Sequence, residues 1–547
     1  METFSIVLVM LLAVVVSGAV IRLIRLPIPL PLVQIALGIA ISTVTGLGVR
    51  LEPEMFFLLF IPPLLFLDGW RIPKVDFFRD LRVTLQLSIG LVLFTVAGMG
   101  FFIHWMIPTI PLAVAFALSA ILSPTDPVAV SAIASRAPIP KRVMHLLEGE
   151  SLLNDASGLV CMRFALAAAL TGAFSFTDAA VSFIWLALGG VAIGAAFTWL
   201  VTSGAIWLTK RFGEDTGTQI LISLLVPFGA YQLAEHLGCS GILAAVAAGI
   251  TMSYAEFTGS ARGETRMQRV AVWNTVQSVA NGTMFLLLGE QLPGILKTVV
   301  KASREAGHGQ VWLLGVYVIA ITAALILLRY LWVWTSLKLT LYRAVRRGEV
   351  YTSPSPRLVA AISVAGVRGA ITLAGVLTFP LTMLDGTGFP ARDLSIFLAA
   401  GVIVLSLGLA SFALPRLLIN LPLPPEDSSE REEDGLRNAA ANAGLQAVET
   451  ARQSLLQRGV EDPDLYARAA DSVTDIYRTR LGAQKNTSEE AKKYRDATKA
   501  ERSFRLTGLK AEREEIFHHA RSNRANDDVV RKLIREIDLL EARLGQS

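Results

Sequence analysis

Apolar stretches long enough to cross a lipid bilayer follow one another along the first 420 residues of this 547-residue chain. A membrane-spanning helix needs about 20 apolar residues. In hydrocarbon every backbone polar group must be satisfied within the protein, so successive apolar segments of this kind form helices. The sequence therefore predicts an all-α polytopic membrane protein. Its thirteen predicted spans cover residues 4–22, 29–48, 53–68, 83–106, 111–135, 142–171, 181–209, 217–237, 239–255, 270–295, 311–337, 357–380 and 393–418.

The density of charge changes after the last predicted span. Residues 425–547 carry 46 charged side chains in 123 positions, whereas residues 1–424 carry 49 in 424. We therefore predict a membrane domain of residues 1–423 and a soluble helical domain of residues 424–547, for which a regulatory role is expected. The predicted helices of the soluble domain cover residues 435–458, 462–482, 488–521 and 527–544. Helices of this domain are expected to pack on one another.

Basic residues near the span ends predict the orientation in the membrane. With the N-terminus outside, the inside loops carry twenty Lys and Arg residues and the outside loops carry five. Cytoplasmic loops are the ones enriched in Lys and Arg. We therefore expect a multi-pass protein of the cell (inner) membrane, with the N-terminus outside and the C-terminal domain in the cytoplasm. The net charge of +5 is then a consequence of topology, and no nucleic-acid partner is expected.

Two of the thirteen predicted spans are interrupted by helix-breaking residues. The fifth contains Ser-Pro-Thr-Asp-Pro-Val at 123–128, and the twelfth contains Gly-Val-Arg-Gly at 366–369. Proline removes a backbone hydrogen bond and ends or kinks a helix. If the spans divide as six, one linker and six, the two halves are inverted and the interrupted spans correspond. Inverted repeats with broken helices are a plan of secondary transporters, so we predict two broken helices that cross.

Three carboxylates lie in apolar sequence around the first interruption, at Asp126, Glu150 and Asp155. A charge in hydrocarbon costs at least about 2.5 kcal/mol, so such a cluster indicates function. Successive helix residues turn about 100°. Glu150 and Asn154 therefore share one stripe of the sixth span, and Ser151 and Asp155 share the next.

This set of carboxylate, hydroxyl and carbonyl oxygens suits a hard monovalent cation. It has no imidazole or thiolate for zinc or copper, and no phosphate-binding loop supports ATP use. No cofactor is expected. One carboxylate that holds either H⁺ or a cation, never both, predicts cation/proton exchange across the lipid bilayer.

The same acids could instead form structural ion pairs with the arginines of the spans. Glu150 with Arg368 is the best candidate for such a pair. Arg163 lies eight residues after Asp155, about 12 Å along the helix, which is too far for a direct pair. Arg329 is expected to contact backbone carbonyls of another helix. Two further acids, Asp68 and Glu235, are expected at span ends. Glu290 is expected at the membrane interface, or alternatively in the lining of an outer vestibule.

Two other functions remain open at this point. One is a K⁺-preferring antiporter or a passive cation channel. The other is an intramembrane aspartyl protease that uses Asp126 and Asp155, since two carboxylates can share a proton. Against the protease, Asp126 lacks the Gly-x-Gly-Asp setting that those enzymes have, and Asn154 beside Asp155 has no role in it.

The motifs of the membrane domain resemble those of the bacterial sodium/proton exchanger branch of the monovalent cation:proton antiporters. The resemblance covers about residues 1–420. It implies thirteen spans, an inverted six-helix repeat, a dimerisation domain, a mobile core domain, a homodimer, and a transporter rather than an enzyme. The motifs are Ser-Pro-Thr-Asp-Pro-Val-Ala-Val at 123–130, Glu-Gly-Glu-Ser-Leu-Leu-Asn-Asp at 148–155, Gly-Ile-Leu-Ala-Ala-Val-Ala-Ala-Gly at 241–249 and Gly-Val-Arg-Gly-Ala at 366–370.

The resemblance also implies roles for individual residues. Asp155 is the ion- and proton-binding carboxylate, and the further binding groups are Ser151, Glu150 and the backbone of Thr125. Asp126 and Asn154 stabilise the crossing, and Arg368 pairs with Glu150. Relatives with Asn before the key Asp exchange one cation for one proton, so exchange of Na⁺, or of Li⁺ or K⁺, is expected to be electroneutral. Pro124 replaces a small residue found in many relatives, which leaves the choice between Na⁺ and K⁺ open.

Overall fold

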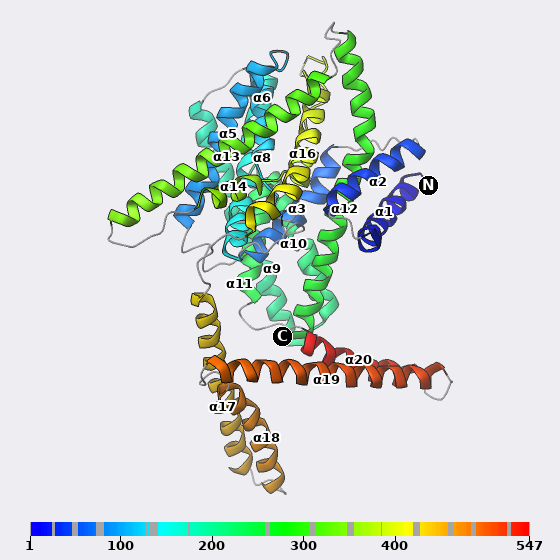
Figure 1. Ribbon diagram of the computed structural model, residues 1–547, viewed down its shortest axis with the longest axis vertical. Helices are drawn as coiled ribbons and strands as arrows, with labels where there is room; N and C mark the ends of the chain where they lie inside the picture. Colours follow the sequence, from blue (N-terminus) through cyan, green and yellow to red (C-terminus); the bar gives the residue numbers. More distant parts are fainter. Residues whose placement is uncertain are drawn as a thin grey trace. The chain divides into compact units, whose positions relative to one another are not determined.

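The structure is a computed structural model, and within the part of the chain that it describes the regular elements are helices (Figure 1). The chain divides into two compact units, Met1–Pro422 and Leu423–Ser547. The described residues are 2–24, 28–45, 53–72, 81–126, 130, 141–172, 176–256, 263–305, 312–346, 355–383, 385–419, 427–457, 463–482, 488–521 and 527–545.

Each of the thirteen predicted spans overlaps at least one described helix of the first unit. Among the described residues, seven helices are by length and composition able to cross a membrane. The second half of the fifth predicted span, apart from Val130, lies outside the described residues. The helices are α1 (Glu2–Ile24), α2 (Leu30–Thr45), α3 (Pro53–Arg71), α5 (Leu81–Met106), α6 (Leu112–Leu122), α8 (Lys141–Thr171), α9 (Phe176–Phe212), α10 (Thr216–His236), α11 (Gly241–Glu256), α12 (Gly263–Glu305), α13 (Trp312–Arg346), α14 (Pro356–Val364), α15 (Ala370–Leu377) and α16 (Arg392–Leu418).

The first unit consists of two groups of helices. In the first, which we call the scaffold bundle, α11 packs between α3, α9 and α10, and α12 packs on α1 and α2. In the second, the core bundle, α8 packs on α5 and α6, and α13 packs on α5, α14 and α16. The bundles meet mainly where α12 and α3 face α15 and α16. Figure 1 shows α5, α6, α8, α13 and α14 together on one side of the unit.

Glycine allows very close helix packing within the scaffold bundle. A Cβ on Gly249 of α11 would overlap the carbonyl oxygen of Phe66 on α3, and it would lie 2.8 Å from the nitrogen of Trp70. A Cβ on Gly38 of α2 would similarly overlap the carbonyl of Leu286 on α12. Membrane helices associate through such small residues because the backbones can approach closely. The small-residue motif at 241–249 therefore has a packing role.

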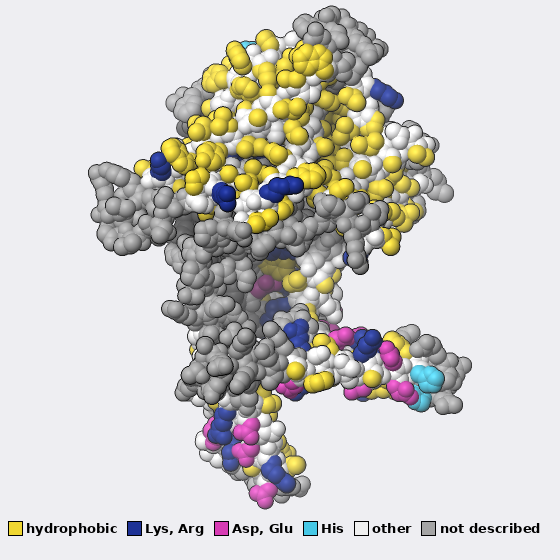
Figure 2. Space-filling model, viewed as in Figure 1, with side chains coloured by type: hydrophobic (Ala, Val, Ile, Leu, Met, Phe, Trp, Pro, Cys, Tyr) yellow, Lys and Arg dark blue, Asp and Glu magenta, His cyan; other side chains and the backbone are white. Residues whose placement is uncertain are grey.

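Large apolar side chains cover much of the visible face of the first unit (Figure 2). Trp105 is 76% exposed, Trp199 is 65% exposed and Phe101 is 61% exposed. Soluble proteins seldom expose large contiguous apolar patches, whereas a lipid-facing surface does so along its whole span. The surface therefore supports the prediction of a polytopic membrane protein.

The second unit consists of paired helices, with α17 (Asp427–Gln457) packed on α18 (Pro463–Gly482) and α19 (Ser488–Arg521) packed on α20 (Asp527–Gly545). Leu509 of α19 and Ile537 of α20 are buried. Beside them Arg513 donates a 2.8 Å hydrogen bond to Asp538 and a second one to Glu541. Apolar burial and charge pairing thus hold the second hairpin together.

Candidate functional site

The two predicted helix breaks lie against each other. α6 ends at Leu122, and the chain from Ser123 to Asp126 is not helical. α14 ends at Val364, and α15 begins at Ala370 after a second stretch without regular structure. The backbone N–H of Asp126 donates a 2.8 Å hydrogen bond to the carbonyl of Val367. The two breaks therefore form a crossing inside the core bundle, which satisfies backbone groups that the helices leave free.

Charged side chains compensate the helix ends at this crossing. Arg368 is 2% exposed, and its Nε donates a 2.9 Å hydrogen bond to the carbonyl of Leu122, the last residue of α6. Its Nη1 donates to the carbonyl of Gly366. A Cβ on Gly369 would overlap the Asp126 carboxylate, which places that carboxylate at the start of α15. A helix has partial positive charge at its N-terminus and partial negative charge at its C-terminus, so both contacts are favourable.

Ser151 and Thr125 line the same small cavity as Asp155 of α8. The Ser151 hydroxyl donates a 2.7 Å hydrogen bond to the backbone carbonyl of Thr125, and it lies 3.4 Å from Asp155 Oδ2. Asn154 Nδ2 donates to the Thr125 hydroxyl at 3.1 Å. Asp155 itself is 3% exposed. The structure thus brings Asp155, Ser151, Thr125 and Asn154 together, and their roles in ion binding stay a prediction.

The partner of Glu150 differs from the prediction. Arg329 of α13, not Arg368, pairs with Glu150: its Nη1 lies 2.6 Å from Glu150 Oε1, and its Nη2 donates to Oε2 at 2.9 Å. Arg329 Nε also donates to the carbonyl of Ile362 at 3.1 Å. Arg329 thus makes the predicted contact with a backbone carbonyl of another helix, and it also takes the place beside Glu150 that was predicted for Arg368. The reason is that Arg368 is already bound to the carbonyls of the crossing, which sequence spacing does not reveal.

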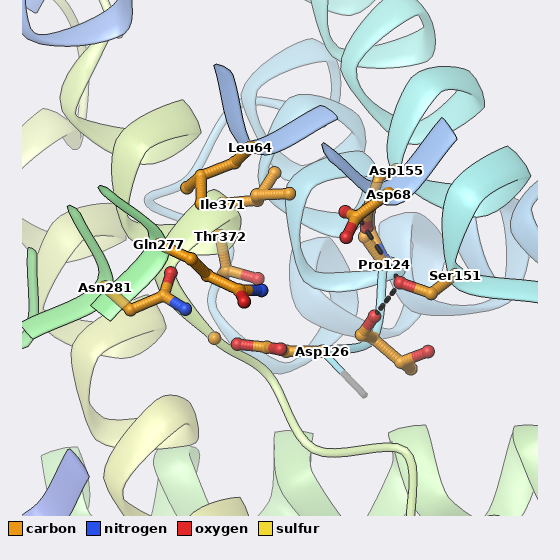
Figure 3. A pocket seen from close by; sticks show the side chains of 12 residues that line it. Leu64, Asp68, Pro124, Asp126, Ser151, Asp155, Gln277, Asn281, Ile371 and Thr372 are labelled. Atoms are coloured by element: carbon orange, nitrogen blue, oxygen red, sulfur yellow. Dashed lines mark hydrogen bonds between the residues drawn. The ribbon is translucent and has the colours of Figure 1, made fainter. Parts of the chain in front are cut away.

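Four polar residues that were not predicted as site residues line the same small cavity as Asp155: Asp68, Gln277, Asn281 and Thr372 (Figure 3). Asp68 lies near the end of α3, as predicted, but it faces the cavity as well. Gln277 and Asn281 are one turn apart on α12. The four-residue spacing of these two amides in the tenth predicted span is the sequence signal that could have indicated their place in the site. The other lining residues are Leu64, Pro124, Thr125, Asp126, Ser151, Gly369 and Ile371.

The cavity lies at the boundary between the two bundles. Asp155, Ser151 and the residues of both breaks come from the core bundle, whereas Asp68, Gln277 and Asn281 come from the scaffold bundle. Arg71 joins the two scaffold helices here, because its guanidinium donates to Gln277 at 2.7 Å and to Asn274 at 2.5 Å. A cation in this cavity would therefore touch both bundles.

Two other residues of the sequence analysis have these surroundings. Glu290 is 4% exposed on α12, where Gly38 of α2 approaches its backbone, and its place at the membrane interface stays a prediction. Pro124, the residue that departs from the family pattern, lines the cavity. A Cβ on Gly158 would lie 2.5 Å from Pro124 Cγ. Pro124 therefore packs closely against α8, about one turn after Asp155.

Comparison with known proteins identifies the family. The sequence matches the family described as "Sodium/hydrogen exchanger, transmembrane" over residues 9–420. This chain belongs to the sodium/hydrogen exchanger family. Members of this family are transporters, which leaves the protease interpretation without support.

Relatives and solved structures agree with this assignment. The chain is 41% identical to "Uncharacterized Na(+)/H(+) exchanger YjcE" of Escherichia coli K12, over 100% of this chain and 99% of that protein. It is also 41% identical to the "Sodium, potassium, lithium and rubidium/H(+) antiporter" of Bacillus subtilis, over 76% of this chain and 62% of that protein. The structure of the sodium proton antiporter MjNhaP1 from Methanocaldococcus jannaschii matches with a TM-score of 0.58 at 20% identity, over 77% of this chain and 99% of that one. The structural match shows a shared fold.

Proposed function

We propose that this sodium/proton antiporter binds Na⁺ and H⁺ in turn at Asp155. The observation that carries the proposal is a carboxylate that is 3% exposed, lies 3.4 Å from the Ser151 hydroxyl and lines a cavity between the two bundles. A carboxylate in such a place needs either a proton or a bound cation to offset the cost of its burial. The two ions therefore exclude each other at this group.

The carbonyl of Thr125 and the hydroxyl of Ser151 complete the proposed cation site. Ser151 now donates to the Thr125 carbonyl at 2.7 Å, so these two oxygens lie next to Asp155. Carboxylate, hydroxyl and carbonyl oxygens are ligands of hard cations. Glu150 acts through its pair with Arg329, which neutralises its charge next to the site. Asp126, Asn154 and Arg368 hold the crossing in place.

Exchange of one cation for one proton is the stoichiometry that we propose. Asn154, which precedes Asp155, is neutral, Glu150 has Arg329 as its counter-charge, and Asp126 lies at the positive end of α15. Of the two remaining carboxylates in the cavity, Asp68 and Asp155, we propose Asp155 as the group whose charge the transported ions balance. Transport should then be insensitive to membrane potential. Clamping the potential of proteoliposomes with K⁺ and valinomycin, with Na⁺ as the driving ion, measures this.

Alternating access would arise from movement of the core bundle against the scaffold bundle. Asp155 and both breaks belong to the core bundle, so its displacement would carry the whole site. We further propose that the chain works as a homodimer in the cell (inner) membrane, with its N-terminus outside. The family resemblance and the distribution of basic residues support these proposals. Light scattering in detergent and cysteine labelling of the two membrane faces test them.

The second unit, Leu423–Ser547, is proposed to be a cytoplasmic regulatory domain. Na⁺ is the proposed main cation, and Li⁺ and K⁺ are the alternatives, because relatives from Bacillus carry names that include sodium, potassium, lithium and rubidium. Measuring all three ions at several pH values in one vesicle preparation decides among them.

The decisive test uses purified protein in proteoliposomes that contain a pH-sensitive dye. Addition of Na⁺ should move protons in the wild type, and Asp155→Asn should abolish this movement. Ser157→Ala serves as a matched control on the same helix, because the Ser157 hydroxyl donates to the carbonyl of Leu153 at 2.7 Å and takes no part in the cavity. Na⁺-driven proton movement that survives in Asp155→Asn would refute the proposal.

A further inference from the structure

One ion pair that the proposed site does not use joins the two bundles. Arg163 of α8 donates through Nη1 to both carboxylate oxygens of Glu235 on α10, at 3.0 Å and 3.3 Å. The side chains are 41% and 30% exposed. α8 belongs to the core bundle and carries Asp155, whereas α10 belongs to the scaffold bundle. The pair therefore connects the ion-binding helix to the part against which it would move.

Glu235 is held firmly on the scaffold side. Its Oε1 also accepts a 3.1 Å hydrogen bond from the backbone N–H of Gly241, the first residue of α11. This N-terminus is the positive end of the α11 dipole, which favours a carboxylate. A Cβ on Gly241 would lie 2.9 Å from Glu235 Cγ and 2.7 Å from Tyr231 Cδ2. The absence of a side chain at Gly241 therefore leaves the space in which the Glu235 side chain lies. Glu235 and Gly241 both belong to the scaffold bundle.

The surroundings of Arg163 on the core side are loosely packed. A second cavity separates α8 from the scaffold here, and its lining is mainly apolar: Val160, Arg163, Phe164 and Ala167 of α8, Leu186 of α9 and Ser240 before α11. Arg163 lies eight residues beyond Asp155, about 12 Å along α8, toward the helix end that we expect outside. At this level the ion pair spans a gap between the bundles.

We propose that the Arg163–Glu235 pair is an outer latch of the transport cycle. The pair is made in the conformation of this structure and closes the route between the bundles on the outer side of Asp155. It must break when the core bundle moves to expose Asp155 to the outside. This proposal rests on the proposed exchange by alternating access. Removing either partner should shift the equilibrium toward the outward-open conformation.

Thiol labelling tests the latch without relying on transport. Val160 lines the second cavity and is 4% exposed, so Val160→Cys, combined with Cys161→Ser and Cys239→Ser, reports access from outside. A membrane-impermeant maleimide is added to intact cells and the labelling rate is measured. Arg163→Gln and Glu235→Gln should each raise the rate roughly two- to fivefold, the range expected from the strength of partly exposed ion pairs.

Three comparisons make the result specific. The double variant should label no faster than either single variant, because one interaction cannot be lost twice. Arg163→Lys should restore slow labelling, and Lys210→Gln, which removes an exposed charge on α9, should leave the rate unchanged. Additive effects of the two Gln variants, or no effect of either, would overturn the latch. Exchange measured on the same variants separates this outcome from failure of the antiport proposal, which Asp155→Asn tests.

Discussion

At the scale of single residues, the site shows which properties spacing can predict. Asp155, Ser151 and Asn154 lie on neighbouring stripes of one helix, so their proximity followed from helical geometry. The partner of Glu150 did not, because three arginines were available and only the tertiary fold decides among them. Asp68 escaped detection for the same reason, since it reaches the cavity from a different bundle.

The pairing of Glu150 with Arg329 gives a direct prediction. Arg329→Gln leaves Glu150 buried without its partner, and loss of one member of a buried pair costs about 3–5 kcal/mol. Glu150→Gln in the same chain removes the unpaired charge, so the double variant should regain most of the lost thermal stability in detergent. Arg368→Gln should show no such rescue by Glu150→Gln, because Arg368 binds the carbonyls of Leu122 and Gly366. Equal rescue of both arginine variants would contradict this assignment.

At the scale of helices, hydropathy and breakers predicted the elements well. The turn between α10 and α11 contains Gly238 with a φ of +69°, a conformation that favours glycine. The twelfth span is a broken helix, and the described helix of the fifth span ends at Leu122, just before the Pro-containing segment. The compensation at their crossing was not predictable, because Arg368 binds the end of α6 while Asp126 lies at the start of α15. Those contacts join segments about 240 residues apart.

Close helix packing in the scaffold bundle predicts a strong effect of one methyl group. Gly249→Ala would place a Cβ into the backbone of Phe66 on α3, and neither backbone can move without separating α3 from α11. Overpacking of this kind costs about 1–3 kcal/mol or more. Gly204→Ala on α9 is the matched control, because nothing lies within 4 Å of the Cβ that it adds. Thermal unfolding in detergent should show a lower midpoint for the first variant and an unchanged or higher one for the second.

At the scale of the whole molecule, the division between Pro422 and Leu423 predicts that the first unit folds alone. A chain that ends at residue 423 contains every residue of the proposed site and the whole family match. It should be purified as a monodisperse protein and should keep Na⁺-driven proton movement that depends on Asp155. A changed pH dependence of the shortened chain would support a regulatory role of the second unit, and loss of folding would refute the independence of the first.

Competition between the two ions links the single carboxylate to the behaviour of the whole transporter. Because H⁺ and Na⁺ exclude each other at Asp155, protons on the side from which the cation enters should raise the apparent KM for Na⁺. Once the site is mostly protonated, mass action makes that increase about tenfold for each further unit of pH decrease. The maximal rate at saturating Na⁺ should stay constant, since enough cation displaces the proton. Initial rates over a range of Na⁺ concentrations and pH values measure both quantities in the same vesicles. A constant KM with a falling maximal rate would place the inhibiting proton at a group other than Asp155.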